Sequence, residues 1–184
     1  MPAKKNLLLI CGSASAASAN QRLLKHIAVQ LALDFECRFA PDLKSLPHFD
    51  PALAGADTPQ IIANFRKSIS DAHGVIICTP EYVFSVPSGL KNAVEWCVAT
   101  TVFGEKPVGL ITASASGVKG HEELQLLMRT VGAQIIPETT WLISGIQSRV
   151  DGEGKLTNPM DAKALQGFLA AFQTLTAGEK KATE

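Results

Sequence analysis

Short apolar runs alternate along the chain with longer segments in which apolar residues recur every three or four positions. The runs are typical of strands and lie at 7–11, 36–39, 74–79, 108–112 and 134–136. The last run begins a strand that can continue past Pro137 towards Ile143. The helical spacing predicts helices at 19–33, 59–72, 88–99, 122–131 and 161–175. Five strands that each lead into a helix predict a doubly wound α/β fold with a mostly parallel sheet.

The segment 40–58 has no clear period and contains Pro41, Pro47 and Pro51. A loop of this length in a compact domain tends to be functional or to pack over a site or an interface. The length of the chain, 184 residues, is that of one domain. We predict a single domain over 1–177 and a disordered tail over 178–184.

Three turns follow strand ends, at 12–20, 80–87 and 113–120. In doubly wound folds, ligands bind beyond the carboxyl ends of the strands, where the strand order reverses. We therefore expect the three turns to line one crevice.

The turn after the first strand is rich in hydroxyl groups. It contains Ser13, Ser15, Ser18 and Asn20, and Ser18 with Gln21 has the spacing of a capping box. Free backbone N–H groups and the positive end of the helix dipole suit a phosphate at such a place. The alternative is an ordinary strand-to-helix connection that happens to be rich in serine.

The turn at 80–87 contains Tyr82, the chain's single tyrosine, between Pro80 and Pro87. Because the prolines fix the backbone at both ends, this turn suits a flat heteroaromatic ring that hydrogen-bonds along its edge. The alternative is a structural turn in which the tyrosine covers the end of a helix.

Charge and composition exclude several classes of partner. Seventeen basic residues balance seventeen acidic ones, so nothing indicates nucleic acid or an anionic membrane as a partner. The N-terminal apolar run is too short for a signal peptide or a membrane helix, and we expect a cytoplasmic protein. The four cysteines are scattered, which argues against disulfides and against a metal site.

Three groups of residues resemble the NAD(P)H-dependent FMN reductases, a flavodoxin-like family that includes bacterial quinone, azo-dye and chromate reductases. They are Gly12-Ser13…Ser18-Ala19-Asn20, Pro80-Glu81-Tyr82…Ser85…Pro87…Leu90-Lys91-Asn92-Ala93…Glu95-Trp96, and Gly132-Ala133. The resemblance extends from Asn6 to about Leu175. It implies a three-layer sandwich with a five-stranded parallel sheet and helices on both faces.

The resemblance also implies an FMN site. The phosphate would be held by Ser13, Ser18 and Asn20 with amides of the first helix, and the ring edge would follow Pro80, Glu81 and Tyr82. The third turn, with Ser114, Ser116 and Gly117, would face the pyrimidine side of the flavin. The implied cofactor-binding set is Ser13, Ser15, Ser18, Ala19, Asn20, Pro80, Glu81, Tyr82, Val83, Ser85, Ser114, Ser116 and Gly117.

Two members of that set depart from the family pattern. Ser15 stands where the family usually has arginine, and Val83 stands where it usually has asparagine. Loss of a charged donor to phosphate costs about 1.5–3 kcal/mol, or roughly ten- to a hundredfold in affinity. We therefore expect FMN to bind more weakly than in the relatives.

The implied activity is transfer of a hydride from NADPH or NADH through FMN to a small-molecule acceptor such as a quinone, an azo dye, chromate or flavin. No catalytic side chain is implied, because the chemistry belongs to the cofactor. The alternatives are an electron carrier, a hydrolase or other nucleotide enzyme on the same fold, and a relative that has lost flavin.

Family resemblance further implies a homodimer or homotetramer. Its apolar interface would come from Trp96, Val98, Val102 and Phe103, although core packing explains Trp96 equally well. His48 and His121 are further candidates for the crevice. Lys119 and Arg129 are candidates for contacts with nicotinamide phosphates, or else ordinary surface charges.

Overall fold

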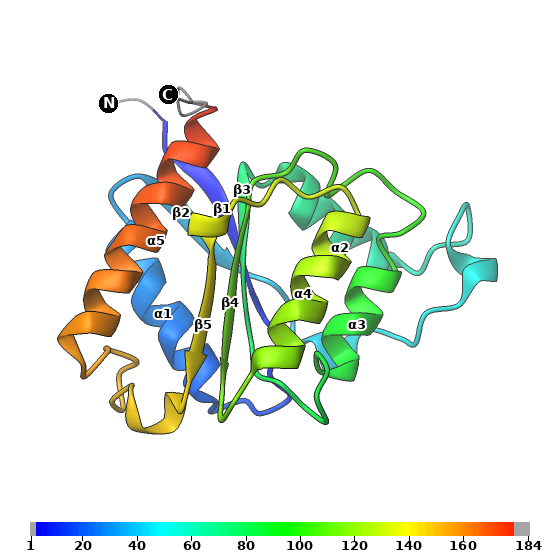
Figure 1. Cartoon of the computed structure of the whole chain (residues 1–184). Coiled ribbons are helices and arrows are strands. Elements are labelled where there is room, and N and C mark those ends of the chain that lie inside the picture. Colours follow the sequence, from blue (N-terminus) through cyan, green and yellow to red (C-terminus); the bar gives the residue numbers. More distant parts are fainter. Residues whose placement is uncertain (1–2, 179–184) are drawn as a thin grey trace.

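A computed structural model describes residues 3–178 as one five-stranded parallel sheet flanked by helices (Figure 1). The strand order is β2-β1-β3-β4-β5, and the strands are β1 (Lys5–Cys11), β2 (Phe35–Phe39), β3 (Gly74–Thr79), β4 (Val108–Ser114) and β5 (Thr140–Ser144). The order reverses between β1 and β3, which pair in parallel register from Leu7 with Gly74 to Cys11 with Cys78. The predicted flavodoxin-like α/β sandwich is confirmed.

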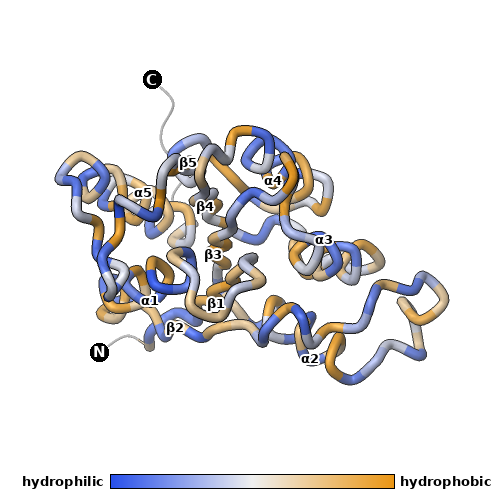
Figure 2. Tube along the Cα trace, turned by 90° about the horizontal axis from the view of Figure 1, so that it is seen from below, coloured by the Kyte–Doolittle hydropathy of each residue, from blue (hydrophilic) through white to orange (hydrophobic). Residues whose placement is uncertain are grey.

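Five α-helices form the two outer layers. They are α1 (Ala19–Leu31), α2 (Gln60–Asp71), α3 (Ser88–Glu95), α4 (Val118–Thr130) and α5 (Pro159–Ala177). Helices α1 and α5 cover one face of the sheet, and α2, α3 and α4 cover the other (Figure 1). Seen onto the carboxyl edge of the sheet, the apolar strands β3 and β4 lie between the two helical layers (Figure 2).

Each layer packs through an apolar helix face that the sequence periodicity predicts. Leu23, Leu24 and Ile27 of α1 are fully buried against one face of the sheet, and Phe65 and Ile69 of α2 are buried against the other. Every residue of β3 and of β4 is buried. These strands therefore read as continuous apolar runs rather than as alternating ones.

Several element boundaries differ from the sequence-based expectation. Strand β5 begins at Thr140 and not at 134–136, because Gln134 makes only an isolated bridge with Pro107, and Pro137 starts a 3-10 turn over Pro137–Thr139. Helix α4 begins four residues earlier than expected, directly after Gly117, whose φ of +90° ends the preceding turn. Helix α3 ends at Glu95 rather than at residue 99.

The expected interface cluster is not a surface cluster. Trp96 and Phe103 are buried in the core beside α2, α3 and α4, so they cannot supply contacts to a second copy. Core packing is thus the correct explanation of Trp96. Val98 is exposed and Val102 is half-buried.

The ends of the described chain bear on two further expectations. The expected tail at 178–184 lies outside the described residues except for Gly178, which ends α5 with a φ of +75°. Within residues 3–178, no helix is long and apolar enough to cross a membrane.

Candidate functional site

The first and second turns meet at the carboxyl edge of the sheet. The hydroxyl oxygens of Ser13 and Tyr82 lie 3.5 Å apart, although 69 positions separate these residues in the sequence. A pocket of about 270 Å³ opens beside this contact. Its lining comes from both turns, from the segment after β2 and from the start of α3: Gly12, Ser13, Ala14, Asp42, Leu43, Lys44, Leu46, His48, Tyr82, Pro87, Ser88, Gly89 and Asn92.

The first turn is held close to β3 by its glycine. The Gly12 amide donates to the Cys78 carbonyl at 2.9 Å, and a Cβ on Gly12 would lie only 2.3 Å from Thr79 Oγ1. Ser18 is the N-cap of α1, and its hydroxyl accepts from the Gln21 amide at 3.1 Å. The predicted helix start at Ser18 is thus confirmed, and the amides of Ala19 and Asn20 follow it in the first helical turn.

A second pocket, of about 210 Å³, lies directly on the first turn. Ser13, Ala14, Ser15 and Ala16 line it, together with Gln21 and the segment after β2. The Ser13 and Ser15 side chains on this pocket can donate hydrogen bonds to an anionic phosphate, and the start of α1 follows directly in the sequence. The residues of this turn therefore fit the phosphate end of FMN.

The side chain of Asn20 is directed into the interior instead of into this pocket. Asn20 is 3% exposed, its Nδ2 donates to the Ala113 carbonyl at 3.1 Å, and its Oδ1 accepts from the Cys78 thiol at 3.2 Å. The side chain thus ties the start of α1 to the ends of β3 and β4. The Asn20 side chain is therefore not available to a phosphate, contrary to the expectation from the sequence.

Charges around the first turn have mixed signs. Ser15 is exposed and brings no cation, whereas Asp42 lines both pockets. Burial raises the pKa of the Cys11 thiol at the base of the turn, and the Asp42 carboxylate adds a smaller shift in the same direction. On the other side, the Arg22 guanidinium is held by the carbonyls of Ala17, at 2.8 Å, and Asp151, at 3.2 Å.

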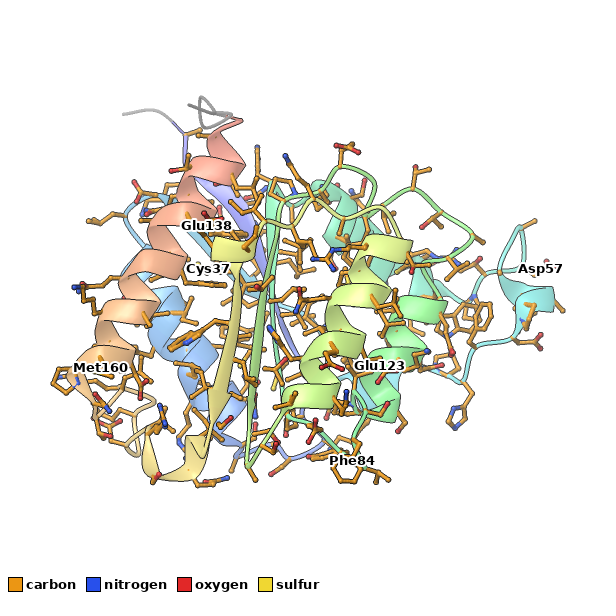
Figure 3. All side chains as sticks on the ribbon, viewed as in Figure 1. Cys37, Asp57, Phe84, Glu123, Glu138 and Met160 are labelled. Carbon is orange, nitrogen blue, oxygen red and sulfur yellow. The ribbon has the colours of Figure 1, made fainter. Side chains whose placement is uncertain are left out.

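The second turn is a two-residue hairpin. The amide of Tyr82 donates to the Ser85 carbonyl at 2.9 Å, and the amide of Ser85 donates to the Tyr82 carbonyl at 3.0 Å. Val83 and Phe84 form its tip and are exposed, and Phe84 lies at the edge of the molecule in Figure 3. Tyr82 is 42% exposed and reaches back towards Ser13.

Two carboxylates fasten this hairpin to α4. Glu81 Oε2 accepts from the Gly120 amide at 2.8 Å, and Glu81 Oε1 accepts from the Gly117 amide at 3.3 Å. In the opposite direction, Glu123 of α4 accepts from the Val86 amide at 2.9 Å and from the Ser85 hydroxyl (Figure 3). The Glu81 and Ser85 side chains therefore hold the turn in place, and the turn offers a ligand its backbone and the Tyr82 ring.

The third turn lies beside the second. The Ser114 hydroxyl is 3.5 Å from the Glu81 carbonyl, and the Ser116 carbonyl accepts from the Ser144 hydroxyl at 2.7 Å. Gly117 cannot be replaced easily, because its φ is positive and a Cβ would lie 2.8 Å from Leu142. All three turns thus reach the same edge of the sheet, but the two pockets described above are lined by the first and second turns and not by the third.

The long segment 40–58 forms one wall of the larger pocket. Asn92 of α3 accepts from the Phe49 amide at 2.7 Å and donates to the Pro47 carbonyl at 2.9 Å, and the Trp96 indole donates to the same carbonyl at 2.7 Å. The motif residues Asn92 and Trp96 therefore anchor this wall. The wall brings Lys44 and Asp42 to the pocket. Neither residue is among the candidates from the sequence, although the unusual length of the segment indicates that it could pack over a site.

The four remaining candidates are His48, His121, Lys119 and Arg129, and they lie in different surroundings. His48 lines the larger pocket. His121 is half-buried on α4, where its Nδ1 lies 2.9 Å from Thr112 Oγ1, and burial lowers the pKa of its imidazole. Lys119 pairs with Glu122 at 2.7 Å and Arg129 hydrogen-bonds to Gln125, both on the exposed surface of α4.

Metal and disulfide chemistry receive no support from the described residues. Between residues 3 and 178 no group of three or more histidine, cysteine, aspartate or glutamate side chains is placed to hold a metal ion. Cys11, Cys37, Cys78 and Cys97 are all free thiols.

Comparison with known proteins extends the likeness over most of the chain. Residues 6–148 match the family model described as NADPH-dependent FMN reductase. The chain is 31% identical to a 2-hydroxy-1,4-benzoquinone reductase of a Burkholderia species, across 90% of this chain and 93% of that protein. It is 28% identical to the quinone reductase of Escherichia coli K12, across 94% and 95% of the two chains.

A solved structure shows the same fold. FerB, a flavoenzyme NAD(P)H:(acceptor) oxidoreductase from Paracoccus denitrificans, superposes with a TM-score of 0.78 at 24% identity, across 95% of this chain and 98% of that one. The family match covers far more than half of the sequence and includes the first, second and third turns. The chain therefore belongs to the NADPH-dependent FMN reductase family and is an NAD(P)H- and FMN-dependent oxidoreductase.

Proposed function

We propose that this protein is an NAD(P)H-dependent quinone reductase that uses FMN bound at the carboxyl edge of the sheet. The contact between Ser13 and Tyr82 carries the proposal, because it joins the turn suited to phosphate and the turn suited to the ring. The quinone as acceptor is supported by the names of the relatives, a benzoquinone reductase at 31% identity and a quinone reductase at 28%.

Each of the three turns would bind a different part of FMN. The Ser13, Ser15 and Ser18 hydroxyls with the amides of Ala19 and Asn20 would hold the phosphate. The backbone of Pro80, Glu81, Tyr82 and Val83, with Ser85 at the base of the hairpin, would follow the ring edge. Ser114, Ser116 and Gly117 would face its pyrimidine side.

Bound FMN supplies the redox chemistry: it accepts a hydride from NAD(P)H and delivers two electrons to the acceptor. Conversion of a quinone to its hydroquinone takes two electrons and two protons: the hydride of NAD(P)H carries both electrons and one proton, and water supplies the other proton. What the protein contributes is orientation of the flavin by two fastened turns and an open face above them. No side-chain acid or base is required in this scheme.

Two measurements test the proposal. Titration of the flavin-free protein with FMN should quench flavin fluorescence, and the loaded protein should oxidise NADH or NADPH when 1,4-benzoquinone is present. Equal turnover with every acceptor would support an NAD(P)H- and FMN-dependent oxidoreductase but contradict the preference for quinones. FMN binding without turnover of a quinone or dye would instead support the electron carrier.

We also propose that the protein associates as a homodimer or homotetramer in the cytoplasm. Exposed apolar side chains at Val98, Val118 and Leu126 give it surface that a second copy can cover. Four free thiols fit a reducing compartment. A monomeric mass by light scattering at micromolar concentration would contradict the association.

A further inference from the structure

The tip of the second turn has a backbone conformation that its residues disfavour. Val83 has a φ of +52° and Phe84 a φ of +58°, and the two hydrogen bonds between Tyr82 and Ser85 close the turn around them. Positive φ at both central residues of a two-residue hairpin is the signature of a type I′ turn. Asparagine followed by glycine is the favoured pair at these positions, and a β-branched valine is a true outlier there.

Side-chain packing does not explain why valine and phenylalanine occupy this tip. Val83 is 95% exposed and Phe84 is 77% exposed, so neither side chain packs against the core to offset the strained backbone. A strained backbone conformation that no side-chain packing offsets points to a role in function.

The surroundings of the tip hold it rigidly. Glu81, immediately before the hairpin, caps α4 through the amides of Gly117 and Gly120, and Glu123 of α4 binds the second half of the turn. The strain is therefore imposed from both sides. Phe84 lies at the lower end of the molecule in the view of Figure 3, and Val83 precedes it in the hairpin that Tyr82 and Ser85 close.

We propose that Val83 and Phe84 form an apolar shelf that binds the ring of the electron acceptor and sets a preference for apolar quinones. This inference rests on the proposed function, because it places the acceptor over the flavin beside Tyr82. Tyr82 lines the open pocket and the two exposed apolar side chains follow it in the hairpin, so an apolar ring bound beside Tyr82 would cover apolar surface that is otherwise in water. A small, charged acceptor would gain no binding free energy from these apolar side chains.

The substitution Phe84→Gly tests the shelf, because it relieves the positive φ at one tip residue and removes the larger of the two apolar side chains. The melting temperature should rise by about 2–5 °C, since the strain is relieved. The KM for 2-methyl-1,4-naphthoquinone should rise about tenfold or more, with kcat changed less than twofold. The KM for ferricyanide and the Kd for FMN should stay within twofold.

Two further variants complete the experiment. Phe84→Leu keeps an apolar side chain and should retain most of the quinone affinity. Val29→Asn removes an apolar side chain of similar exposure, 75% against 77% for Phe84, from α1 and should leave both KM values unchanged.

The outcomes separate the shelf from the proposed function. An unchanged quinone KM in Phe84→Gly overturns the shelf, as does an equal loss with ferricyanide or a weaker FMN Kd, which would mean a disturbed flavin site. A lower mass by light scattering would identify the tip as a contact between copies and would also overturn it. Absence of turnover with either acceptor in the unaltered protein would contradict the proposed function itself.

Discussion

Glu81 and Glu123 hold each other's segments. Glu81, on the turn after β3, accepts hydrogen bonds from two amides at the start of α4, and Glu123, on α4, accepts from Val86 and Ser85 on the turn. A carboxylate at a helix N-terminus is also favoured by the helix dipole. Through this exchange the position of the second turn depends on the position of α4.

Glu123→Ala should loosen the turn. The substitution leaves the Val86 amide without its acceptor, so we expect a loss of about 1–3 kcal/mol in the free energy of unfolding and a weaker Kd for FMN. Urea denaturation and flavin fluorescence titration measure the two effects. Glu123→Gln retains an acceptor oxygen and should lose less, and Glu122→Ala, which breaks only an exposed pair with Lys119, should change little. Equal behaviour of the three variants would contradict the coupling.

Ser15→Arg should tighten FMN binding. Ser15 is exposed on the pocket that we propose for the FMN phosphate, and a guanidinium there would add a charge-assisted contact to the phosphate. We expect the Kd for FMN to fall about ten- to a hundredfold. Riboflavin, which lacks the phosphate, is the control: if its Kd fell as much, the pocket would not be the phosphate site.

Asp42→Asn should act on the same ligand by removing a repulsion. Asp42 lines the pocket that we propose for the FMN phosphate, and it also lines the larger pocket. Because its carboxylate is exposed, salt screens its repulsion of the phosphate. We expect the Kd for FMN to fall about two- to fivefold at low ionic strength and to converge with the unaltered protein at about 1 M salt. A salt-independent change would show that Asp42 acts through the shape of the loop instead.

Gly12→Ala should destabilise the protein because there is no room for the added methyl group. The new Cβ would meet the buried Thr79 side chain at 2.3 Å, and relief requires the first turn to move away from β3. A loss of about 1–3 kcal/mol in thermal or urea unfolding is expected. Gly167→Ala is the matched control: it lies in the exposed part of α5 with nothing nearby, and it should stabilise by about 0.5–1 kcal/mol.

Acidification should destabilise the protein partly through His121. Burial lowers the pKa of this imidazole below 6.5, so the unfolded chain binds the proton more readily than the folded one. The contribution to stability is complete above pH 6.5 and is lost as the pH falls below that value towards the folded pKa. Melting temperatures measured between pH 7.5 and 5 should therefore decline less steeply in His121→Asn than in the unaltered protein.

The sequence determined the layers, the strand succession and the three turns, because these depend on local signals. Apolar runs such as 74–79 and helical faces such as Leu23, Leu24 and Ile27 must be buried wherever the chain goes. The start of α1 at Ser18 and the crevice at the carboxyl edge follow from capping and from parallel pairing. The family was readable for the same reason, since its motifs lie in those turns.

Only the tertiary structure decided what the individual polar side chains do. Asn20 is used for buried hydrogen bonds to Ala113 and Cys78, and Glu81 is used on α4, because partners far away in the sequence become neighbours when the strands align. The same holds for Asp42 and Lys44, which enter the pocket only because Asn92 and Trp96 anchor their segment. The strain at Val83 and Phe84 is likewise invisible in the sequence, since it arises from the clamp on both sides of the hairpin.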